Sequence, residues 1–136
     1  MEKIKKKCIN PNDLFNSQQY GFSQIVVAGT GKNVFISGQV AWDENLKIIG
    51  KGDLTKQTEK SLDNLKAAVN SAGGTLDDIV LLRIYIVNYK KEYGLVINQG
   101  LKKYFGTESP PASTWISVQG LADEDFLIEI EAQAVI

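Results

Sequence analysis

The sequence predicts an α+β fold in which two helices pack on one face of a mixed β-sheet. Three patterns support this prediction. An almost wholly apolar run at 79–87 is typical of a strand in the centre of a sheet. Residues 53–74 and 91–105 carry apolar side chains at helical spacing, and residues 126–135 alternate between apolar and polar side chains, as a strand does. The resulting order, βββαβαββ, is typical of an α+β domain.

The first part of the chain is predicted to form three strands. The first covers residues 3–9, and we interpret its four lysines as charges that protect an edge strand from unwanted pairing. Strands at 22–28 and 33–40 flank the segment Gly29-Thr30-Gly31-Lys32. This turn signal predicts a hairpin between the second and third strands.

Capping and breaking residues define the helices. Asp53 is a good N-cap for the first helix, which Gly73-Gly74 ends. The second helix ends at Gly106. Pro110-Pro111 then break the chain before a strand at 113–118.

One face of the predicted sheet has an unusual composition. Alternation places seven side chains on it: Leu81, Arg83, Tyr85, Val87, Leu127, Glu129 and Glu131. This set is too apolar to be left in water and too charged for an ordinary core. The pattern therefore predicts burial of this face against a partner subunit.

Length and composition indicate one domain, residues 1–136, with 43% hydrophobic and 23% charged residues. The chain has no long apolar run and no signal-peptide pattern at its start, so we expect a cytoplasmic protein without a membrane segment. A net charge of −1 disfavours nucleic-acid binding. The single cysteine, Cys8, excludes an internal disulfide, and the absence of histidine excludes Ser-His and Cys-His catalysis and histidine-based zinc sites.

A set of short segments carries a family resemblance, and its members are Ser37-Gly38-Gln39-Val40, Leu62-Asp63-Asn64-Leu65, Asn98 before Tyr104-Phe105, Pro111-Ala112, and Ile128-Glu129-Ile130-Glu131-Ala132. In this order the set resembles the RidA/YjgF family, whose members are also called endoribonuclease L-PSP or translation-inhibitor proteins. The resemblance covers roughly residues 3–135.

The resemblance implies a chorismate-mutase-like fold and a homotrimer whose sheets line a central barrel. It places small-molecule clefts between subunits. In RidA enzymes these clefts hydrolyse reactive imino or enamine acids to keto acids and ammonia. No metal and no organic cofactor is implied.

The family's site residues map only in part onto this chain. Glu129 matches the glutamate that orients the hydrolytic water, and Ser37 and Asn98 match a pocket serine and asparagine. The family motif Pro-Ala-Arg-Ser reads here Pro111-Ala112-Ser113-Thr114, so Ser113 replaces the arginine that grips the substrate carboxylate. Phe22 stands for a pocket tyrosine, and Trp115 for a small residue.

Three of these interpretations have alternatives. Arg83, the only arginine, either pairs with a glutamate of the last strand or turns toward the cleft to bind an anion. Glu129 either positions water or merely neutralises Arg83. Asn98 either binds ligand or caps backbone groups.

Two function classes follow. The first is a trimeric, cofactor-free imine or enamine hydrolase in which Glu129 places water and Ser37, Asn98, Phe22, Trp115 and the Ser113-Thr114 backbone hold the ligand. The second is a non-catalytic metabolite sensor that uses the same clefts. RNA cleavage, the family's older description, has little support from an acidic chain without histidine.

Overall fold

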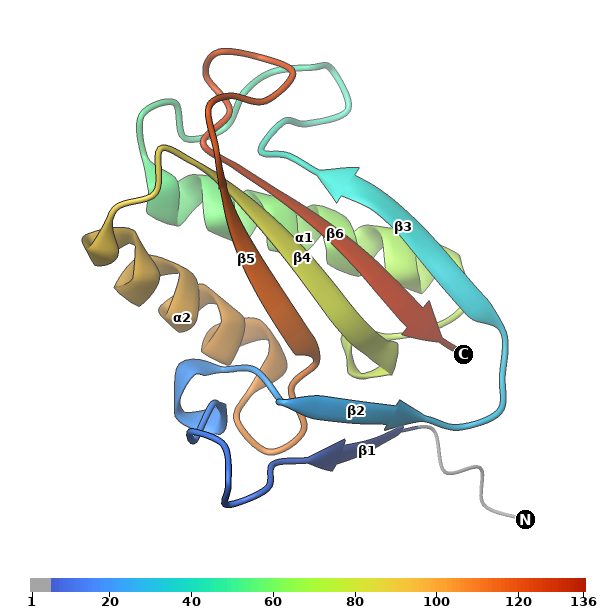
Figure 1. Ribbon diagram of the computed structural model, residues 1–136. Helices are drawn as coiled ribbons and strands as arrows, with labels where there is room; N and C mark the ends of the chain where they lie inside the picture. Colours follow the sequence, from blue (N-terminus) through green and yellow to red (C-terminus); the bar gives the residue numbers. More distant parts are fainter. Residues whose placement is uncertain (1–5) are drawn as a thin grey trace.

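The computed structural model describes residues 6–136, and within them the predicted order of strands and helices is confirmed (Figure 1). Two short 3-10 helices, η1 and η2, add to that order. The elements are β1 (Lys6–Ile9), η1 (Gln18–Tyr20), β2 (Ile25–Ala28), β3 (Asn33–Gln39), α1 (Leu54–Ser71), η2 (Leu76–Asp78), β4 (Ile79–Val87), α2 (Lys91–Phe105), β5 (Ala112–Val118) and β6 (Ile128–Val135). Residues 3–5 of the predicted first strand lie outside the described residues.

Four strands form the main sheet, in the order β3-β6-β4-β5. β6 is antiparallel to both of its neighbours, whereas β4 and β5 are parallel, so the sheet is mixed as predicted. The parallel pair needs a long crossover, which α2 provides. Both helices lie on the same side of this sheet (Figure 1), and the predicted α+β layering is therefore confirmed.

The predicted hairpin between the second and third strands is wrong. β2 pairs with β1 in a separate two-stranded sheet, while β3 pairs with β6. Reciprocal backbone hydrogen bonds between Lys32 and Ile136, of 2.7 and 3.0 Å, join the start of β3 to the end of β6. In that register Ile36 lies opposite Ala132, and both are buried. Burying this apolar face outweighs the local turn preference of residues 29–32, which instead link the two sheets.

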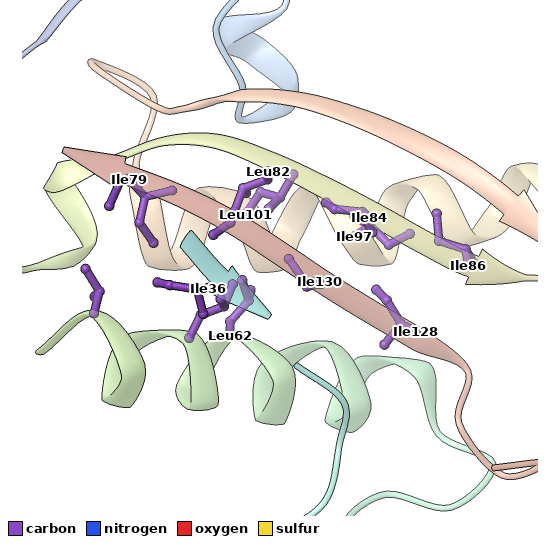
Figure 2. Packing of buried hydrophobic residues seen from close by; sticks show 14 residues of the cluster. Ile36, Leu62, Ile79, Leu82, Ile84, Ile86, Ile97, Leu101, Ile128 and Ile130 are labelled. Carbon is purple, nitrogen blue, oxygen red and sulfur yellow. The ribbon is translucent and has the colours of Figure 1, made fainter. Parts of the chain in front are cut away.

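Buried aliphatic side chains fill the space between the main sheet and the two helices (Figure 2). β4 and β6 supply most of the sheet side of this core, and α1 and α2 supply the other side. Each fully buried side chain of this kind contributes about 1.5–3 kcal/mol to folding. The labelled members are Ile36, Leu62, Ile79, Leu82, Ile84, Ile86, Ile97, Leu101, Ile128 and Ile130.

Helix α1 begins where the sequence predicts, because the Asp53 carboxylate accepts a hydrogen bond from the Lys56 backbone N–H at 3.0 Å. Its buried Gln57 side chain makes hydrogen bonds to the backbone of the segment that leads into β6. Gln57 Nε2 donates to Asp125 O at 2.9 Å, and Gln57 Oε1 accepts from Leu127 N at 2.9 Å. The last strand therefore starts at Ile128, two residues later than predicted.

No helix within residues 6–136 combines the length and apolar character needed to cross a bilayer.

The core lies on one side of the main sheet only. Its other side, which we call the open sheet face, carries outward side chains of all four strands, among them Phe35, Leu81, Arg83, Tyr85, Val87, Thr114, Ile116, Val118, Glu129, Glu131 and Gln133. The burial of this face against a partner subunit stays a prediction.

Candidate functional site

Four of the predicted ligand-binding residues line a single pocket, which we call the Trp115 pocket. Its volume is about 260 Å³, and it is lined by Phe15, Tyr20, Phe22, Asn98, Ser113 and Trp115. These residues come from the loop before β2, from α2 and from β5. The fold therefore brings together positions that are as much as a hundred residues apart in the sequence.

The polar wall of the Trp115 pocket is formed by β5 and α2. Trp115 lies in register with the buried Ile84 of β4 and packs against the core, so its side chain points to the helix side of the sheet. Ser113, two residues earlier, points to the same side. Asn98 faces them from α2, which covers this edge of the sheet.

The apolar wall is an aromatic cluster in the loop between β1 and β2. The ring of Phe15 lies 6.4 Å from that of Tyr20 and 6.1 Å from that of Phe22, in tilted and edge-to-face arrangements. Ser23 holds this loop against the start of β5. Its backbone N–H donates to Pro111 O at 2.9 Å, and its hydroxyl donates to Pro110 O at 2.5 Å.

Three buried polar atoms at this pocket have no hydrogen-bond partner. They are Asn98 Oδ1, Ser113 Oγ and Trp115 Nε1. Only two other buried side-chain polar atoms within residues 6–136 lack a partner, and both are hydroxyls of α1. Such atoms each cost folding free energy, and all three are closed off from solvent in the single chain, so a ligand or water can complete their bonding only after neighbouring side chains move. The carboxamide oxygen of Asn98 caps no backbone group, contrary to the alternative above.

A second cavity, of about 500 Å³, shares Trp115 and Asn98 with the Trp115 pocket. Both residues therefore contribute to two cavities. The Trp115 ring lies 6.4 Å from that of Tyr89, and Lys91 and Glu92 contribute one charge of each sign to the rim of this second cavity.

The charged groups of the open sheet face form a separate cluster. Arg83 Nη1 lies 3.9 Å from Glu131 Oε1, and the Tyr85 hydroxyl donates to the same oxygen at 2.5 Å. The hydrogen bond to the Glu131 carboxylate raises the pKa of Tyr85 above its ordinary value. Arg83 thus pairs with Glu131 and not with Glu129. Its side chain is 52% exposed in the single chain, so the pair is not buried there and contributes at most about 1 kcal/mol.

Glu129 also lies on the open sheet face, two residues before Glu131 in β6, and it is in register with Tyr85 of β4. Its carboxylate packs closely over the backbone of Gly38. A Cβ placed on Gly38 would come within 2.6 Å of Glu129 Cδ and Oε2, so a larger residue here would require the flexible Glu129 side chain to turn away. The glycine lies where the register of β3 against β6 shifts, between Ile36 and Gln39.

The remaining predicted residues, Ser37 and Thr114, lie away from the Trp115 pocket. Ser37 lines a cavity of about 220 Å³ on the open sheet face, together with Arg83 and Glu131. Thr114 lies on the same face, in register with Arg83. The predicted set is therefore divided: Phe22, Asn98, Ser113 and Trp115 meet on the helix side of β5, while Ser37, Thr114 and Glu129 lie on the opposite face of the sheet.

Sequence reasoning missed Phe15, Tyr20 and Tyr89 as pocket residues. The first two stand with Phe22 in a short loop that carries three aromatic residues within eight positions. This local enrichment was the available signal. Tyr89 lies two residues after the end of β4, and its backbone N–H donates to Ser117 Oγ of β5 at 3.1 Å, which holds it beside Trp115.

Comparison with known proteins gives consistent matches along most of the chain. A family model described as endoribonuclease L-PSP matches residues 16–136. A RutC family protein of Pyrococcus horikoshii is 37% identical over 113 residues, which cover 83% of this chain and 85% of the relative.

Comparison with solved structures agrees with these sequence matches. A protein of unknown function of the conserved Rid family, YyfB from Yersinia pestis, superposes with a TM-score of 0.94 at 38% identity and covers 98% of this chain and 100% of its own. RidA from an Antarctic Psychrobacter superposes with a TM-score of 0.69 at 29% identity, covering 84% of this chain and 87% of its own.

Proposed function

Because the chain belongs to the RidA/YjgF family, we propose that it binds a small labile metabolite and hydrolyses an imine or enamine without a cofactor. The observation that carries this proposal is the Trp115 pocket. There, three buried polar atoms lack partners beside an aromatic wall, which is how a small-molecule site is built. We place this activity in the cytoplasm.

The proposed assembly is a homotrimer joined through the open sheet face. Phe35, on that face, is 77% exposed in the single chain, and an apolar residue so placed favours contact with another copy. β5 is the edge strand of the sheet and also carries the polar wall of the Trp115 pocket. A partner that covers this edge with its own open sheet face would bring Glu129 of the partner subunit toward the pocket.

Chemically, the proposed role of Glu129 is that of a general base. Its carboxylate takes a proton from a water molecule as the water oxygen forms a bond to the imine carbon, and the carboxylic acid so formed gives that proton to the imine nitrogen. The resulting carbinolamine then loses ammonia and leaves a carbonyl group. Histidine is not needed for this step, in agreement with its absence from the chain.

Ser113 limits the substrates that this site can use. A serine hydroxyl cannot reproduce the two charge-assisted hydrogen bonds that an arginine makes to a carboxylate. The loss of such a partner in a desolvated cleft costs about 2–5 kcal/mol, or roughly 30- to several-thousand-fold in binding. Simple 2-imino acids are therefore expected to be poor substrates.

A coupled assay tests the hydrolysis. An amino-acid oxidase supplies a 2-imino acid, and keto-acid release is followed with and without the protein. We expect slow hydrolysis by the natural chain, loss of that activity in Glu129→Gln, and faster hydrolysis by Ser113→Arg. Rates equal to the buffer rate for both the natural chain and Ser113→Arg would refute the proposed activity.

Sedimentation tests the assembly. Phe35→Glu places a charge on the open sheet face and is expected to convert the trimer to monomers. Leu46→Glu is the matched control, because Leu46 is 67% exposed but lies in the loop between β3 and α1. A natural chain that sediments as a stable monomer would contradict the proposed assembly.

A second candidate function is a non-catalytic metabolite sensor. It is favoured by the position of Glu129, which lies on the opposite face of the sheet from the Trp115 pocket of its own chain. A sensor would gain thermal stability from a bound metabolite without turning it over.

RNA cleavage has no supporting observation of this kind. The described chain offers no basic stripe beside the pocket, and the open sheet face presents Glu129 and Glu131. RNA degradation by purified protein that disappears in Glu129→Ala would bring RNA cleavage back as the function.

A further inference from the structure

We propose that the Trp115 pocket selects an uncharged, planar molecule that presents a hydrogen-bond acceptor and a donor side by side, as a cyclic amide does. This inference rests on the proposed function only in that the pocket is taken as the small-molecule site. Three properties of the pocket support it: its charge, its unpartnered polar atoms and its aromatic walls.

The charge of the lining argues against an ionised ligand. None of the six side chains that line the Trp115 pocket carries a charge. The only arginine of the chain, Arg83, lies on the open sheet face and pairs with Glu131. In the adjoining cavity Lys91 stands with Glu92, so neither sign is in excess there. An anion placed in the Trp115 pocket would lose its hydration without gaining a counter-charge. Glu129 of the partner subunit, if it approaches as proposed, would repel that anion further.

The unpartnered atoms specify the polarity of a ligand that reaches them once the neighbouring side chains move. Trp115 Nε1 can only donate a hydrogen bond, Asn98 Oδ1 can only accept one, and Ser113 Oγ can do either. A ligand that satisfies all three must offer at least one acceptor and one donor. A cyclic secondary amide presents its carbonyl oxygen and its N–H on the same edge. It therefore matches the polar wall, whereas a carboxylate offers acceptors alone.

The aromatic side chains specify the shape. Phe15, Tyr20 and Phe22 form one wall, and the indole of Trp115 contributes to another. Flat aromatic surfaces favour a flat ligand that stacks or packs edge-to-face. A volume of about 260 Å³ is small for a ligand site, so a molecule of one or two rings is the expected size.

The test uses three probes that share one ring system: 2-quinolinone, which has the cyclic amide; N-methyl-2-quinolinone, which lacks the N–H; and quinoline-2-carboxylate, which is an anion. Binding is followed by NMR on the ¹⁵N-labelled full chain. The sequence has two tryptophans, so two indole N–H resonances are expected, and Trp42→Phe identifies the one that belongs to Trp115.

We expect 2-quinolinone to shift the Trp115 indole resonance in a saturable manner. The N-methyl probe is expected to bind about tenfold more weakly, because one buried acceptor stays unpartnered. The carboxylate is expected to bind more weakly still, and Ser113→Arg to reverse the order so that the carboxylate binds best. Ser61→Ala is the matched control: Ser61 is also a buried serine with an unpartnered hydroxyl, but it lies on α1, so its loss leaves the probe affinities unchanged.

The inference is overturned if the carboxylate binds the natural chain as tightly as 2-quinolinone. Equal affinity of the N-methyl probe, or no shift of the Trp115 resonance with any probe, also overturns it. These measurements need no turnover. Selective 2-quinolinone binding without imine hydrolysis would refute the proposed activity and leave the inference standing. Imine hydrolysis together with tighter binding of the carboxylate than of 2-quinolinone would refute the inference and leave the proposed activity standing.

Discussion

Replacing Ser113 by alanine should stabilise the unliganded protein, although Ser113 lies in the candidate site. Its hydroxyl is buried and has no hydrogen-bond partner. A buried hydroxyl without a partner costs about 1–3 kcal/mol, and alanine removes that cost while losing only one atom of packing. We therefore expect Ser113→Ala to raise the free energy of unfolding by about 1 kcal/mol. For a chain of 136 residues this corresponds to a melting temperature about 3 °C higher.

Two further serine-to-alanine variants, at other buried serines, serve as comparisons for the stability of Ser113→Ala. Ser23 is also buried, but its hydroxyl donates to Pro110 O, so Ser23→Ala should lower the free energy of unfolding by about 1–2 kcal/mol. Ser61 has a buried hydroxyl without a partner, and in a helix alanine adds about 0.5 kcal/mol of propensity. Ser61→Ala should therefore stabilise at least as much as Ser113→Ala.

Urea unfolding and thermal melts of the three variants provide the measurement. Protein concentration is held constant, because the melting temperature of an oligomer depends on it. In the presence of 2-quinolinone the order should change, since only Ser113→Ala loses the stabilisation that the ligand gives. A loss of stability in Ser113→Ala as large as that in Ser23→Ala would mean that the Ser113 hydroxyl has a native partner. The reasoning from unpartnered atoms would then be refuted.

Three other predictions concern packing and pH. Gly38→Ala should cost only about 0.5 kcal/mol in a urea titration, because its Cβ meets the far end of the Glu129 side chain, which can turn away; combining it with Glu129→Ala should remove that cost, and a much larger loss would mean that Glu129 cannot move. Leu62→Ala should cost about 2–5 kcal/mol in the same titration, since Leu62 is fully buried between α1 and the sheet, and a smaller loss would contradict that packing. Burial, and a hydrogen bond to Asp63, raise the pKa of Tyr104 above its ordinary value of 10.0. The stability that Tyr104 contributes is therefore present below pH 10 and falls as the pH rises above it, and stability melts of Tyr104→Phe should show a shallower decline in that range than the natural chain.

The sequence by itself determined the local structure and the family. Apolar periodicity and capping are properties of neighbouring residues, so the helix that begins after Asp53 and the strand at 79–87 were predictable from the chain alone. The resemblance also named Phe22, Asn98, Ser113 and Trp115, and these residues do share one pocket.

Only the tertiary structure decided which distant segments meet. The turn signal at 29–32 predicted a hairpin, but strand pairing depends on which register buries an apolar face, and burial of Ile36 places β3 beside β6. The partner of Arg83 depends on a second register, that of β4 against β6, which places Arg83 opposite Glu131 and not opposite Glu129. Hydrogen-bond satisfaction is equally non-local. No pattern in the sequence reveals that the Ser113 hydroxyl lacks a partner, because the absence follows from the positions of all the atoms around it.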